Sequence, residues 1–91
     1  MNSIYETPAM KAARLEWAIK EWRKLPVATK SALLPVLKAA PDKGECGIQF
    51  TAAFNLPVFR TVAQWEWSAL RDILVTIVDY ATAEQLKELV K

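Results

Sequence analysis

The segment 57–81 reads PVFRTVAQWEWSALRDILVTIVDYA, and it decides the fold of this chain. Placed at steps of about 100° per residue, its apolar side chains cover roughly 220° of the circumference, about twice the stripe of an ordinary surface helix. A helix this apolar must be covered on most of its sides. We therefore predict one long central helix over residues 57–81, covered by the other helices, by a second copy of the chain or by another protein.

Proline and capping residues mark the helices that precede it. Thr7 followed by Pro8 is typical of a helix start, and Pro26 disfavours continuation beyond residue 25. These signals predict a first helix over residues 8–25 and a second over residues 27–40. Within the second helix the ring of Pro35 would clash with the preceding turn, so we predict that this helix kinks or divides there.

The remaining segments are a loop and a short last helix. Residues 41–50 contain both glycines of the chain, charged neighbours and no helical period, which predicts the main loop. Residues 50–54 could add a short helical turn. Thr82 and Gln85 have the spacing of a capping box, which predicts a last helix over residues 83–90.

Composition supports the same fold class. The 91 residues are 53% hydrophobic and 24% charged, with fourteen alanines and only two glycines, which favours one helical globular domain. We predict an all-α, compact bundle of four to five helices in a single domain over residues 1–91. Residues 1–7 lack the basic start and apolar run of a signal peptide, and the longest apolar stretch is too short to span a membrane. A cytoplasmic protein with no membrane partner is therefore expected.

The chain lacks the residue types on which common catalysis depends. It has no histidine and a single cysteine, Cys46, which removes the commonest general base, most zinc sites and any internal disulfide. Its acidic residues are scattered, and no glycine-rich phosphate loop is present. We expect no enzyme activity, no metal and no cofactor, and we interpret Cys46 as an unreactive loop residue.

Two groups of residues are candidates for binding a partner. Around Trp17, which lies almost opposite the core face of the first helix, are Arg14, Lys20 and Lys24. A tryptophan among basic side chains is typical of a binding anchor, although it could equally belong to a second buried stripe.

The second group centres on Glu66, which falls within the apolar arc of the long helix between Trp65 and Trp67. A carboxylate flanked by two aromatic residues could anchor an interface. The alternatives are that Glu66 emerges at the end of the bundle or pairs with a basic residue of the first helix, because an unpaired buried carboxylate costs several kcal/mol.

Charge is distributed unevenly along the chain. Residues 1–43 carry eight basic and four acidic side chains, whereas residues 44–91 carry four and six, so the halves are +4 and −2. This asymmetry could steer an acidic partner to the first half or let two copies pair head to tail.

These observations favour a non-enzymatic protein-binding module, an adaptor, inhibitor or assembly factor that acts by occlusion or scaffolding, with a homodimer as one form of that binding. The alternative is a DNA-binding regulator, because residues 51–65 have the outline of a helix-turn-helix with Arg60 and Gln64 exposed. Against this alternative, the helix that would have to recognise DNA, which begins near residue 57, is too apolar. The local charge also provides no phosphate-binding stripe.

Overall fold

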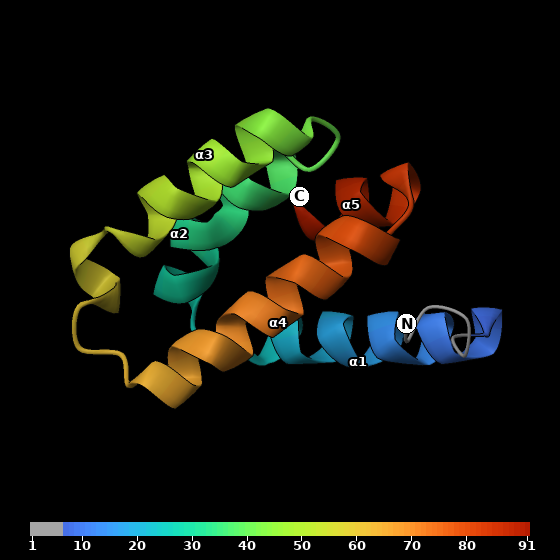
Figure 1. Cartoon of the computed structure of the whole chain (residues 1–91), viewed down its shortest axis with the longest axis horizontal. Coiled ribbons are helices and arrows are strands. Elements are labelled where there is room, and N and C mark those ends of the chain that lie inside the picture. Colours follow the sequence, from blue (N-terminus) through green and yellow to red (C-terminus); the bar gives the residue numbers. More distant parts are fainter. Residues whose placement is uncertain (1–6) are drawn as a thin grey trace.

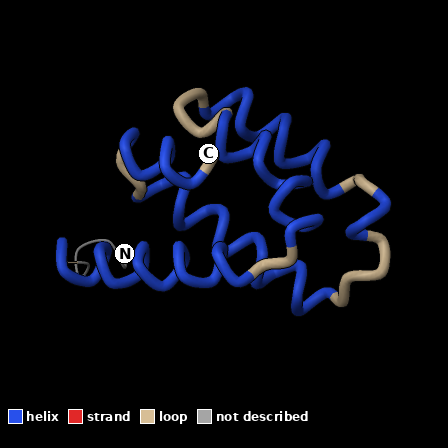
Figure 2. Tube along the Cα trace, turned by 180° about the vertical axis from the view of Figure 1, so that it is seen from behind, coloured by secondary structure: helices blue, strands red, loops and turns tan. Residues whose placement is uncertain are grey.

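The chain folds into helices, most of which begin at a capping side chain or a proline. The computed structural model describes residues 7–91, apart from the side chain of residue 58. Its elements in order are α1 (Pro8–Lys24), α2 (Val27–Lys38), α3 (Lys43–Phe54), the short 3-10 helix η2 (Pro57–Phe59), α4 (Gln64–Tyr80) and α5 (Ala83–Leu89). No strand occurs among the described residues, so the predicted all-helical class is confirmed (Figure 2). The prediction about a signal peptide concerns residues that, up to residue 6, lie outside the described range.

The helices pack as two pairs. α1 lies against α4, and α2 lies against α3 (Figure 1). Contacts between α2 and α4 join the pairs, and α5 rests against α2. The radius of gyration is 13.2 Å, close to the roughly 12 Å expected of a compact chain of this length.

A single apolar core fills the space between the pairs. Its most enclosed side chains come from α2 and α4: Leu33, Val36, Leu37, Leu74 and Ile77. α1 contributes Leu15, Ala18 and Trp22, and α3 contributes Cys46 and Ala53. Each long helix therefore gives one face to the same core.

The first and last helices begin as predicted. The backbone N–H of Met10 donates to the Thr7 hydroxyl over 3.1 Å, and α1 ends just before Pro26. At α5 the Gln85 N–H donates to Thr82 Oγ1 over 3.2 Å, while the Thr82 N–H donates to Gln85 Oε1 over 2.8 Å. The capping box read from the sequence is thus confirmed.

α2 passes through Pro35 without dividing. It continues to Lys38, so the predicted break is wrong. The backbone carbonyl of Pro35 still accepts from the N–H of Ala39 over 3.1 Å, which preserves the last turn. The predicted kink at Pro35 stays a prediction.

The predicted loop over residues 41–50 is wrong, because most of it is helix. α3 begins at Lys43, where the Asp42 carboxylate accepts from the N–H of Glu45 over 3.1 Å. Neither glycine of this helix has a positive φ. Glycine weakens a helix by only about 1 kcal/mol, and the helical spacing of Cys46, Phe50 and Ala53 lets α3 pack one face against the core.

The long helix predicted over residues 57–81 is also wrong in its first part. Residues 57–59 form η2, and α4 begins only at Gln64. Phe59 is almost fully buried, and its ring centroid lies 4.9 Å from that of Phe54, so η2 folds back onto the end of α3. The connection turns the chain between α3 and α4 (Figure 1), which a continuous helix would prevent.

Candidate functional site

The two tryptophans of α4 lie on different sides of that helix. Trp65 is 72% exposed. Trp67 is half-buried, and its ring centroid lies 4.7 Å from that of Phe54 and 6.3 Å from that of Phe50. Two residues along an α-helix correspond to a rotation of about 200°, so both indoles cannot face one partner. The structure therefore does not bring the predicted group of Trp65, Glu66 and Trp67 together.

Glu66 is exposed at the first turn of α4. It shares the phase of buried Ile73 and Ile77, yet it emerges because the helix has only just begun. The carboxylate lies near the positive end of the helix dipole, where it is favourable. The sequence alternative in which Glu66 emerges at the end of the bundle is the one the structure shows.

The predicted group around Trp17 on α1 is also split between two surfaces. Trp17 is 45% exposed, and Arg14 lies one turn earlier with its guanidinium carbon 5.9 Å from the centroid of the Tyr80 ring. Lys24 continues the same side of α1, where its Nζ lies 3.9 Å from Glu21 Oε1. Lys20 instead lines a pocket between α1 and α5.

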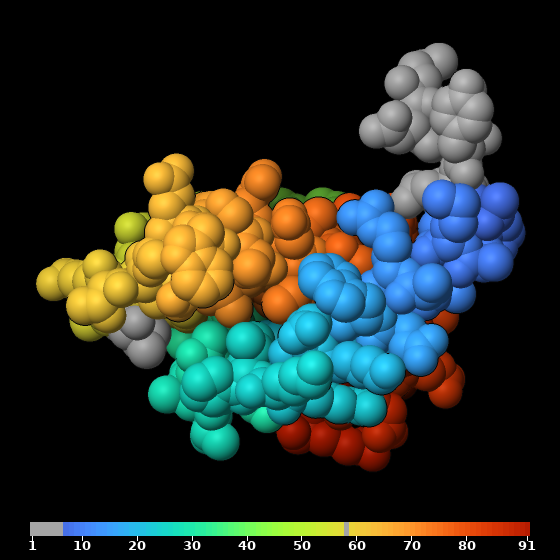
Figure 3. Space-filling view, turned by 90° about the horizontal axis from the view of Figure 1, so that it is seen from below, coloured from blue at the N-terminus to red at the C-terminus, as the bar shows by residue number. Residues whose placement is uncertain are grey.

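α1 and α4 run in opposite directions (Figure 1), and accordingly Arg14, in the first half of α1, meets Tyr80, the last residue of α4. Trp17 follows Arg14 by one turn of α1. Trp65 lies on the same side of α4 as Tyr80. By helical phase, both indoles flank the contact between the two helices. Figure 3 shows a face of the molecule on which α1 (blue to cyan) lies beside α4 (orange). We call this the seam surface: Arg14, Trp17, Glu21 and Lys24 of α1 with Trp65, Ala69 and Asp72 of α4.

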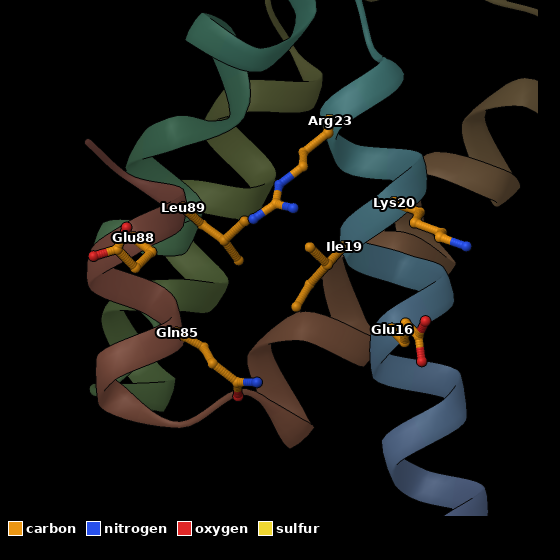
Figure 4. A pocket seen from close by; sticks show the side chains of 7 residues that line it. All are labelled: Glu16, Ile19, Lys20, Arg23, Gln85, Glu88 and Leu89. Atoms are coloured by element: carbon orange, nitrogen blue, oxygen red, sulfur yellow. The ribbon is translucent and has the colours of Figure 1, made fainter.

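A second candidate is the pocket between α1 and α5, with a volume of 410 Å³ (Figure 4). Ile19 and Arg23 point from α1 toward Leu89 of α5, and Gln85 points into the gap between the helices. Lys20 projects away from α5. The pocket combines apolar side chains on opposite walls with a guanidinium group beside them.

Sequence reasoning missed Arg23, Gln85 and Leu89. The spacing of Ile19 and Arg23 places them on one flank of α1, and this pattern is readable in the sequence. What the sequence does not give is the position of α5 beside that flank, because the two helices are far apart along the chain.

Cys46 lies in α3 rather than in a loop. It is 7% exposed, and its Sγ donates to the carbonyl of Val36 over 3.5 Å. A pocket of 160 Å³ between α3 and α4 reaches the thiol, and the ion pair of Lys43 and Asp79 spans it at 3.2 Å. Burial raises the pKa of the Cys46 thiol, a change that nearby Lys43 opposes and Asp79 reinforces. The thiolate is therefore disfavoured in the folded chain.

We expect Cys46 to react slowly with a disulfide reagent in the folded protein and rapidly once urea unfolds it. The folded chain holds the thiol proton more tightly than the unfolded chain, so its stability should fall as pH rises above the ordinary thiol pKa of about 8.5. Ser68→Cys supplies the control, because Ser68 is exposed on α4 and the added thiol should react at once. Equal rates for both thiols would contradict this prediction.

The segment proposed as a helix-turn-helix does not form one. Thr51 to Phe54 are the last turn of α3, and residues 55–63 separate that helix from α4. Arg60 lies in this connection, so it does not project from a recognition helix together with Gln64. A connection of this length is longer than the tight turn that defines the motif.

No group of three or more histidine, cysteine, aspartate or glutamate side chains in residues 7–91 is placed to hold a metal ion. Within the same residues no helix has both the length and the apolar character needed to cross a membrane. Comparisons with protein-family models, with curated proteins and with solved structures found no match for the chain.

Proposed function

We propose that this chain is a non-enzymatic protein-binding module, an adaptor, inhibitor or assembly factor that acts through the seam surface. The observation that carries the proposal is the exposure of two indoles, 72% for Trp65 and 45% for Trp17, beside one helix pair. Tryptophan and arginine are enriched at the centres of interfaces, where they supply most of the binding energy. Trp17 and Trp65 would be the anchors, with Arg14 and Lys24 beside them.

The charges around the anchors suit a polar rim. Arg14 and Lys24 lie on α1, and Asp72 is exposed on α4. Because both signs occur on the seam surface, a second copy of the chain is an alternative partner to a different protein. DNA binding is not proposed, since Arg60 and Gln64 are not on one recognition helix. The cytoplasmic location and the lack of a cofactor stay predictions from the sequence.

The proposal predicts that Trp65→Ala or Trp17→Ala abolishes capture of the partner. Truncating an anchor typically costs about 2 kcal/mol or more of binding free energy, a loss of roughly thirtyfold in affinity. The experiment uses the full chain as bait in an extract of the native host, with mass spectrometry of the captured proteins. Ile48→Ala is the matched control, because Ile48 is 64% exposed but lies on α3, in the other helix pair.

A protein captured by the wild type and by Ile48→Ala, but by neither tryptophan variant, would support the seam surface. Capture of the same proteins by all four baits would contradict it. Sedimentation velocity over a wide concentration range distinguishes the alternative partner, because a dimer that Trp65→Ala converts to monomer assigns the seam surface to a second copy.

A further inference from the structure

The pocket between α1 and α5 continues into a second one. The neighbouring pocket, of 280 Å³, is formed by α1, α2 and α5 and shares Arg23, Glu88 and Leu89 with the first. Together they form one groove along α5, which we call the basic groove. It lies on the flank of α1 that faces α5, whereas the seam surface lies on the flank that borders α4.

Positive charge predominates in the basic groove. The cations that line it are Arg23, Lys30 and Lys91, against Glu16 and Glu88, while Lys20 lies at its edge and projects away from α5 (Figure 4). Lys91 Nζ lies 2.9 Å from Glu88 Oε1, so these two charges offset each other. Within residues 7–91, neither Arg23 nor Lys30 has a carboxylate within 4.0 Å. Lys30 Nζ donates to the backbone carbonyl of Arg23 over 3.5 Å, so the two cations lie close together in the groove without an acidic partner among the described residues.

Apolar side chains line part of the groove. Ile19 and Leu89 are half-buried and point toward each other from opposite walls, with the guanidinium of Arg23 beside Leu89 (Figure 4). Val27, 76% exposed, extends the apolar surface onto α2. An apolar side chain inserted between Ile19 and Leu89 would place a neighbouring carboxylate within reach of Arg23, whose planar guanidinium can bind both carboxylate oxygens.

From this arrangement we infer that the basic groove binds an acidic amphipathic segment of a protein partner. The segment places an apolar side chain on Ile19 and Leu89 and a carboxylate on Arg23, in the manner of a helix laid into a groove. Nucleic acid fits less well, because the cations are few, two acids lie among them, and the apolar pair of Ile19 and Leu89 has no counterpart in a phosphate backbone. The inference goes beyond the proposed function, because it concerns a second surface and names the chemistry that this surface recognises.

A random peptide library displayed on phage and selected against the full chain tests this inference. The enriched peptides should combine Asp or Glu with Leu, Ile or Phe on one helical face. When such a peptide is added, the backbone amide signals of the protein that shift in NMR spectra should be those of α1 and α5. Arg23→Glu should weaken binding by about tenfold or more, since a charge-assisted contact becomes a repulsion. Lys38→Glu is the matched control, because Lys38 is an exposed cation of α2 outside the groove.

Circular dichroism must first show that Arg23→Glu folds like the wild type. The inference is overturned if no peptide is enriched, if the enriched peptides lack acids, or if both charge-reversed variants bind them equally. Peptides that lose affinity with Trp65→Ala but not with Arg23→Glu would overturn it while supporting the seam surface. Sedimentation with phosphatidylglycerol vesicles that is lost in Arg23→Glu would overturn it by assigning the groove to a lipid surface.

Discussion

Trp22→Ala should lower the free energy of unfolding by about 3–5 kcal/mol, the usual cost of removing a buried tryptophan. Trp22 is 3% exposed and shares the core face of α1 with Leu15 and Ala18. The residual cavity would lie in the core, beside the pocket that α1, α2 and α5 form. A domain of this size has a total stability near the lower end of about 5–15 kcal/mol, so the variant should be largely unfolded at physiological temperature.

Trp17→Ala is the matched control on the same helix. Trp17 is 45% exposed, and surface substitutions usually change stability by about 0.5 kcal/mol or less. Urea titrations followed by far-UV circular dichroism measure both variants against the wild type. If both variants shifted the urea midpoint equally, α1 would not bury the face that carries Trp22.

These two residues show what local sequence can predict. The phase of α1 separates Trp22 from Trp17, because Trp22 shares its side with Ala18 and Leu25. The ends of α1 and the start of α5 depend on caps and prolines within one turn of the helix end. Such features are local, and the structure confirms them.

The errors arise where tertiary packing decides. Gly44 and Gly47 look like loop residues, yet Asp42 caps α3 and the packing of Cys46 and Ala53 outweighs the helix-weakening effect of glycine. Residues 57–63 keep a helical period in sequence, but Phe59 packs on Phe54 and the chain turns instead. Periodicity alone does not tell a helix from a turn whose apolar residues reach the same core.

The candidate surfaces also depend on tertiary packing. The phase of α1 separates Trp17 from the core face but leaves open a second buried stripe, whereas in the fold Trp17 is 45% exposed. The basic groove was not predicted, because α1 supplies Ile19 and Arg23 while Leu89 comes from the other end of the chain. A site assembled from distant helices requires the fold before it can be recognised.

Trp67→Ala should destabilise the chain by about 2–4 kcal/mol, whereas Trp65→Ala, two residues earlier, should change stability by about 0.5 kcal/mol or less. Trp67 contacts the rings of Phe50 and Phe54, and each aromatic pair contributes about 0.5–1.5 kcal/mol beyond the apolar area that it buries. Trp65 is 72% exposed. The aromatic contacts connect α4 to α3, so their loss should release the end of α3 that supports η2.

Thermal unfolding and amide hydrogen exchange measure this pair of variants. For a domain of this size 1 kcal/mol corresponds to about 4–8 °C, so Trp67→Ala should lower the Tm by roughly 10 °C or more and speed exchange near the end of α3. Trp67→Phe keeps a ring in the cluster and should recover part of the loss. If Trp65→Ala proved the more damaging change, the aromatic cluster would not hold α3 to α4, and Trp65 would have to be a core residue instead of an interface anchor.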